Sequence, residues 1–149
     1  MANRNEHLQL GGLAGPSYSF IMSSVLGKQA SFEEIAGACI SSLITACLPD
    51  IIEPADHPNH RSHFHSLAIL GLCAVAWPFV EGFRQQQLSL AEHYENQARV
   101  YNTPDEQMYW QREAQKRRFY AGLLAGLIPG YVSHLLADAQ TPKGLPLIG

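Results

Sequence analysis

Residues 119–137, FYAGLLAGLIPGYVSHLLA, form the last long apolar run of the chain and decide its fold class. The run follows a basic triplet at residues 116–118, is interrupted by Pro129 and Gly130, and carries His134 near its far end, with Asp138 just beyond it. No segment of the chain shows the alternation of apolar and polar residues that is typical of strands. The sequence therefore predicts an all-α fold.

Three further apolar runs predict three more helices, at residues 8–26, 32–47 and 67–80. Ser31, followed three positions later by Glu34, forms a capping-box pattern that starts the second helix, and Pro49 is expected to end it. The third helix is expected to bend near Pro78 and to close at residues 81–84. The result is a bundle of four apolar helices that run alternately up and down.

A polar insert, at about residues 84–118, separates the third apolar helix from the fourth. Within it, Thr103, Pro104 and Glu106 give a helix cap, a proline at the first helical position and a second capping box. The insert is therefore predicted to form a helical hairpin. At 149 residues the whole chain, 1–149, is expected to be one domain.

Two pairs of side chains have the spacing of metal ligands. His134 and Asp138 are four residues apart, so on a helix both project from one face and can bind one ion. Asp50 and Glu53 are three apart, and carboxylates so close in apolar surroundings need cations to offset repulsion and desolvation. Asp138 alone would be interpreted as a helix-end residue, and its pairing with His134 favours a ligand.

The loop between the second and third helices adds histidines. His60 and His65 are five residues apart, which does not suit one helical face, so His60 is placed in the loop and His65 in the first turn of the third helix. Three roles are open for His57 and for His63: a metal ligand, a hydrogen-bond partner of a ligand, or an ordinary loop residue. By spacing alone, His7 is as much a surface residue as a ligand.

An up-down path brings these side chains to one end of the bundle. One or two divalent ions, most simply zinc, would then be held by seven ligands: His7, Asp50, Glu53, His60, His65, His134 and Asp138. Two divalent ions against three carboxylates would leave a net positive charge, which favours an anionic substrate, above all a phosphoester or related ester, which Arg61 would clamp. The expected reaction is metal-assisted hydrolysis, with Glu53 or Asp50 accepting a proton from the attacking water.

Composition excludes some functions and favours a membrane. A net charge of −3 and a pI near 6.1 argue against nucleic-acid binding, which needs a clear excess of Lys and Arg. The mean hydropathy of −0.09 hides a polar insert within a far more apolar remainder, and each of the four apolar helices is about long enough to cross a bilayer. Lys28, Arg84 and the triplet 116–118 lie at the end opposite the ligands, which favours a cytoplasmic location for that end.

Three strings resemble the YdjM-like family of membrane-bound metal-dependent hydrolases, whose bacterial members are often under LexA control: LPDIIEP (48–54), HRSHFHS (60–66) and GYVSHLLADAQTPKGLPL (130–147). The family's motif falls on His7, Asp50, His60, Arg61, His65, Ser66, His134, Asp138, Thr141, Pro142 and Gly144. Two departures are Glu53, where other members have Asp, and the long polar insert. The resemblance implies a multi-pass protein of a bacterial inner membrane, and the charge bias described above then favours a metal end that faces the periplasm.

Other functions and locations fit the same sequence. The metal could only staple the helices while the polar hairpin binds a partner protein, or the hairpin alone could recruit or inhibit a host factor. A soluble or peripheral protein and a homo-oligomer are also compatible with the chain. The leading hypothesis is hydrolysis of an anionic small-molecule or lipid substrate, because a site at a membrane end meets headgroups directly.

Overall fold

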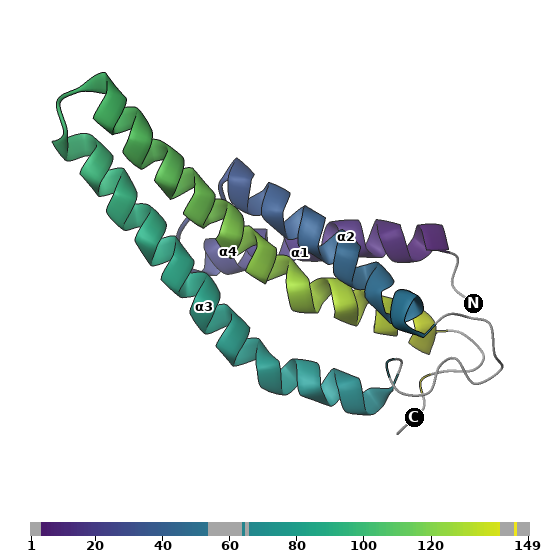
Figure 1. The fold of residues 1–149 in the computed structure, drawn as a ribbon. Helices are drawn as coiled ribbons and strands as arrows, with labels where there is room; N and C mark the ends of the chain where they lie inside the picture. Colours follow the sequence, from purple (N-terminus) through teal and green to yellow (C-terminus); the bar gives the residue numbers. More distant parts are fainter. Residues whose placement is uncertain (1–3, 54–63, 65, 141–144, 146–149) are drawn as a thin grey trace.

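The computed structural model describes residues 4–53, 64, 66–140 and 145 and places almost all of them in four helices. These are α1 (Arg4–Val25), α2 (Phe32–Ile52), α3 (Leu67–Val100) and α4 (Pro104–Ala139). Consecutive helices run in opposite directions (Figure 1). The described ranges contain no strand, so the all-α prediction is confirmed for them.

The predicted helix starts are confirmed by their caps. The Ser31 hydroxyl accepts a hydrogen bond from the Glu34 amide at 3.2 Å, and the Thr103 hydroxyl accepts one from the Glu106 amide at 3.4 Å. The predicted end of the second helix is wrong, because α2 continues through Pro49 to Ile52. A proline removes one amide donor, but the carbonyl of Pro49 still accepts from the Glu53 amide at 2.9 Å, so the last turn closes.

The predicted hairpin lies where expected, but it is not a separate insert. Helix α3 does not close at residues 81–84, and α4 does not begin at residue 119. Both helices run unbroken from the apolar bundle into the polar arm and meet at residues 101–103, so the arm projects beyond α1 and α2 (Figure 1). Trp110 packs against Tyr94 and Tyr101 there, with ring centroids 5.5 and 5.9 Å apart.

Helix α4 is the centre of the fold because it packs against each of the other three helices. Its contact with α2 depends on glycines: a methyl group at Gly122 would overlap the carbonyl oxygen of Glu34, and one at Gly126 would overlap that of Ala38. Small residues allow helix backbones to approach closely. This close approach brings His134 on α4 beside the last turns of α2.

Helix α3 is attached on one side only. Among the described helices its backbone packs against α4 alone, and only 6% of its most apolar stretch is buried, against 39% in α2 and 44% in α4. Large exposed side chains line it, including Leu72, Val75, Phe79 and Phe83, which are 61–69% exposed. Such a surface suits lipid rather than water.

Three helices, α2, α3 and α4, are long and apolar enough to cross a membrane. Helix α1, with 22 residues, is long enough, as predicted, but it is not apolar enough to be counted with these three, because its serine and glycine residues dilute its apolar side chains. Sixteen residues separate Glu34 from Asp50 along α2, a rise of about 24 Å and close to the hydrocarbon thickness of a bilayer.

A buried ion pair fixes α3 to the helices that its backbone does not reach. Arg84, which is fully buried, donates to Glu34 on α2 at 2.6 Å, to Glu81 at 2.8 Å and to the Ser23 hydroxyl on α1 at 3.2 Å. Ser19 also donates to Glu34, at 2.6 Å. Arg84 therefore does not belong to an exposed basic end, as the sequence suggested, because its charge is neutralised inside the bundle.

Candidate metal centre

Three predicted ligands come together in the structure. His7 lies in the first turn of α1, and His134 and Asp138 lie one turn apart near the end of α4. Each offers one ligand atom, and these atoms all lie within 4.8 Å of one another. All three residues are buried, with exposed fractions of 4%, 0% and 2%. This group can hold a metal ion.

The shortest separations within the group are close to the separation of two ligands that share one ion. The Nε2 atom of His134 lies 3.5 Å from an Asp138 carboxylate oxygen, and the Nε2 atom of His7 lies 3.8 Å from the other oxygen. A nitrogen–oxygen hydrogen bond is shorter, up to about 3.2 Å. Two ligands about 2.1 Å from the same tetrahedral ion are about 3.4 Å apart. The separations therefore leave room for an ion between the atoms.

The orientation of His134 is set by the backbone of α2. Its Nδ1 atom lies 2.6 Å from the carbonyl oxygen of Ala46. A carbonyl only accepts, so Nδ1 carries the hydrogen, and in the neutral ring Nε2 presents its lone pair to the carboxylates. A backbone partner on the far nitrogen is the usual way in which proteins orient a ligating imidazole. The ring of His7 stacks on that of His134, with centroids 4.0 Å apart.

Asp50 stands at the rim of the group. One of its carboxylate oxygens lies 3.6 Å from Nε2 of His134, and its side chain is 49% exposed. Three helices therefore contribute to this end of the bundle: α1 through His7, α2 through Asp50, and α4 through His134 and Asp138. The sequence prediction that the N-terminal histidine and the HxxxD pair converge is confirmed.

Glu53 has a different position from the three-residue group. It caps the end of α2, and its carboxylate accepts a hydrogen bond from the Phe64 amide at 3.1 Å. The Tyr131 hydroxyl donates to the Phe64 carbonyl at 2.8 Å. The backbone at residue 64 is thus held from both sides, by α2 and by α4, so Glu53 connects these helices to the segment that precedes α3.

Two of these contacts could not be predicted from the sequence. The partners are backbone groups, the Ala46 carbonyl for His134 and the Phe64 carbonyl for Tyr131, and a backbone group has no residue signature. The remaining predicted site residues lie outside the described ranges: His57, His60, Arg61, His63, His65, Thr141, Pro142 and Gly144. Their roles stay predictions.

Known proteins do not add to this description. No protein-family model, curated protein or solved structure matches the chain. Membership of the YdjM-like family therefore stays a prediction, and the candidate centre depends on its own geometry.

The centre lies at one end of the bundle. The start of α1 and the ends of α2 and α4 gather there, whereas the α3–α4 arm points the opposite way (Figure 1). Because Asp50 lies in the last turn of α2, a membrane that covers the apolar helices would leave the centre near its boundary. A polar ligand could then reach the exposed Asp50 side without entering the hydrocarbon.

Proposed function

We propose that this chain is a membrane-embedded, metal-dependent hydrolase of the YdjM-like type that acts on an anionic phosphoester or a related ester. One observation carries the proposal: His7 lies more than a hundred residues from His134 and Asp138 in the sequence, yet the three ligand atoms converge within 4.8 Å in a buried site. Two imidazoles and a carboxylate are ligands that a divalent ion prefers in proteins, and their mixture of nitrogen and oxygen atoms suits zinc.

The proposed chemistry follows from the charges at the site. A bound divalent ion lowers the pKa of water toward neutrality and attracts an anionic substrate. Asp50, exposed at the rim and 3.6 Å from His134, is placed to accept a proton from the attacking water. Glu53, with one oxygen on the Phe64 amide, is the second candidate for that role. Arg61 is proposed to clamp the phosphate, and His60 and His65 to complete the ligand set.

We place the protein in a bacterial inner membrane, with the metal centre toward the periplasm. Six of its ten lysines and arginines lie on the arm side of the apolar segments: Lys28, Arg99, Arg112 and the triplet 116–118. Basic residues accumulate on the cytoplasmic side of membrane proteins. The substrate would then be a phosphoester at headgroup depth on the opposite side.

The test is metal content and turnover in the same sample. Purified full-length protein is analysed for bound metals and assayed with bis(p-nitrophenyl) phosphate, with and without a chelator. We expect bound zinc and metal-dependent hydrolysis, and both should fall to background in His134→Ala. The matched control is His93→Ala, because His93 is exposed on the arm. Full hydrolysis by a metal-free sample would reject the proposal.

A second candidate function is that the ion only staples the helices. The ligand atoms come from α1 and α4, with Asp50 of α2 beside them, so an ion would tie three helices together. In that case chelation should unfold the bundle, because binding energy would be folding energy. If the site is catalytic, the chelated protein should keep most of its helical circular dichroism and regain hydrolysis when zinc is restored.

A further inference from the structure

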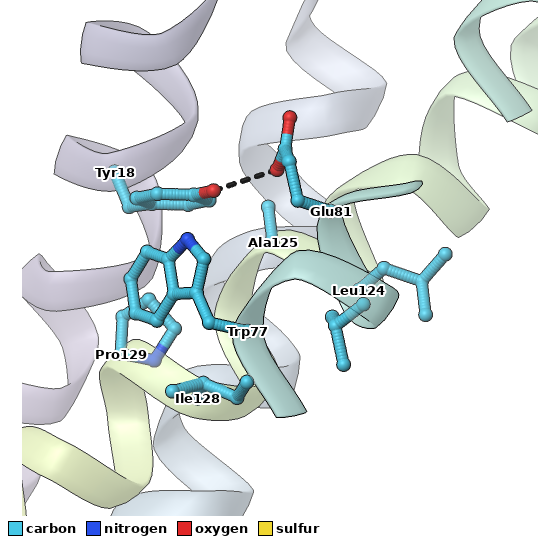
Figure 2. A pocket seen from close by; sticks show the side chains of 8 residues that line it. Tyr18, Trp77, Glu81, Leu124, Ala125, Ile128 and Pro129 are labelled. Atoms are coloured by element: carbon cyan, nitrogen blue, oxygen red, sulfur yellow. Dashed lines mark hydrogen bonds between the residues drawn. The ribbon is translucent and has the colours of Figure 1, made fainter. Parts of the chain in front are cut away.

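A small pocket lies between α1, α3 and α4, on the side of the bundle where the arm begins. Tyr18 and Trp77 form one wall, the Glu81 carboxylate lies at its edge and accepts from the Tyr18 hydroxyl, and α4 contributes an apolar floor of Leu124, Ala125, Ile128 and Pro129 (Figure 2). The cavity has a volume of about 10 Å³, and it opens to the surroundings on one side. A cavity of this size has room for about one water molecule, so it fits a single group as small as an ammonium head.

The charges beside the pocket do not balance. Arg84 contacts two carboxylates, Glu34 and Glu81, so the three groups together carry a formal charge of −1. Arg84 and Glu34 are 0% and 1% exposed, and the Glu81 side chain is 18% exposed. Arg118 also interacts electrostatically with Glu34, but its own ion pair is with Glu95. An unbalanced charge among apolar helices is expensive and typically marks a functional site.

Glu81 is the group that can receive a ligand. Its two oxygens accept from Tyr18 at 2.6 Å, from Arg84 at 2.8 Å and from Gln85 at 2.6 Å, all within the described residues. A carboxylate has about four acceptor positions, so one is left. A donor entering the pocket would use that position and would also neutralise the residual charge.

The aromatic wall favours a cation as that donor. Tyr18 and Trp77 meet edge to face, with centroids 4.8 Å apart, and the Arg84 guanidinium already lies 5.9 Å from the Tyr18 ring. No described cation is found over the ring of Trp77, which is the best aromatic partner for one. The pocket thus combines a carboxylate acceptor, an indole and an apolar floor.

We propose that this pocket binds a primary ammonium group. One N–H donates to Glu81, the charge lies against Trp77, and the attached carbon chain follows Leu124 and Ile128. A quaternary ammonium has no N–H and would leave the acceptor position of Glu81 unused. The ligand is either a free alkylamine or the headgroup of an amine-bearing lipid. A headgroup can reach the pocket because Glu34 lies about 24 Å from Asp50 along α2, near the opposite boundary of the apolar segment. The site is separate from the metal centre.

The experiment measures binding of ethylammonium to the full-length protein in a nonionic detergent by saturation-transfer NMR of its methyl signal. We expect saturable binding that is not reproduced by tetramethylammonium or by potassium chloride at equal ionic strength. Glu81→Gln should bind at least tenfold more weakly. Glu113→Gln is the control, because Glu113 lies on the arm and pairs with Lys116. Unchanged binding by Glu81→Gln, or equal binding of tetramethylammonium, would overturn the proposal.

A second variant guards against a folding defect in Glu81→Gln. Trp77→Leu keeps the carboxylate and should weaken ethylammonium binding severalfold, whereas Trp77→Phe, which keeps an aromatic face, should lose less. Equal binding by the leucine variant and the wild type would contradict the aromatic contact. In nanodiscs, loss of the ethylammonium signal when phosphatidylethanolamine joins phosphatidylcholine identifies the lipid headgroup as the source, and an undiminished signal identifies the free amine. Either result supports ammonium recognition.

Discussion

Charged residues in this protein differ in how much they contribute to stability, and two arginines show the contrast. Arg84 is fully buried and shared by Glu34 and Glu81. Arg118 pairs with Glu95 at the surface, where the two side chains are 21% and 35% exposed. Removing one member of a buried pair leaves the other charge without compensation, whereas water replaces the lost partner at the surface.

We therefore predict that Arg84→Met lowers the free energy of unfolding by about 3–5 kcal/mol. Arg118→Met should cost no more than about 1 kcal/mol. The double variant Arg84→Met/Glu34→Gln should recover part of the loss, since it removes the stranded charge. Unfolding of the detergent-solubilised protein by sodium dodecyl sulfate, followed by circular dichroism, measures all three. Equal losses for the two arginines would contradict the buried network.

A second prediction concerns the hydroxyl of Tyr131, which donates to the Phe64 carbonyl at 2.8 Å. Tyr131→Phe removes this bond and keeps the ring, so the free energy of unfolding should fall by about 1 kcal/mol. Tyr120→Phe is the control, because Tyr120 is exposed on the same helix and should tolerate the change. If both variants unfold alike, the hydroxyl does not hold residue 64.

At the scale of whole helices, the close contact of α2 with α4 is the feature that positions the metal centre. Gly122 and Gly126 let the two backbones meet, and that contact places the Ala46 carbonyl 2.6 Å from His134. Added bulk at the glycines would push the helices apart and pull the carbonyl away from the imidazole. Stability and metal affinity should therefore change together.

We predict that Gly122→Ala lowers the free energy of unfolding by about 1–3 kcal/mol and weakens zinc binding. The matched control is Gly71→Ala on α3, where nothing lies within 4 Å of an added methyl group. That change should be neutral or stabilise the helix by about 0.5 kcal/mol, because alanine favours helices over glycine. Zinc titration and detergent unfolding test both variants, and a neutral Gly122→Ala would contradict the close packing.

The helices show what local sequence can predict and what it cannot. The caps at Ser31 and Thr103 depend on residues three positions apart, so the sequence located both helix starts. The predicted helix ends at Pro49 and at residues 81–84 are wrong. Neither a proline nor a change from apolar to polar residues stops a helix that tertiary packing continues to support. The polar arm was recognised, but its continuity with the bundle depends on contacts between α3 and α4.

At the scale of the molecule, the apolar surface of α3 and the two polar ends of the bundle together indicate an arrangement across a bilayer. We predict that the end of the bundle with the metal centre faces the periplasm and that the α3–α4 arm lies in the cytoplasm. Alkaline phosphatase fused after the C-terminus should be active in a bacterial host, whereas the same enzyme inserted at Asn102, in the exposed turn of the arm, should be inactive. The reverse pattern would show that the orientation is inverted.

The candidate centre could be anticipated from sequence only in part. His134 and Asp138 share a helix face, so their spacing predicted their pairing, which the 3.5 Å separation supports. His7 could not be decided by spacing, because its partners lie more than a hundred residues away and only the packing of α1 on α4 brings them together. The position of Arg84 was misjudged for the same reason: its partner Glu34 is on another helix.

The stack of His7 on His134 has a consequence for biogenesis. His7 lies in α1 and His134 in α4, so the histidine pair cannot form until α4 has left the ribosome and packed against α1. Any ion that both histidines bind can therefore be taken up only after α4 has been synthesised.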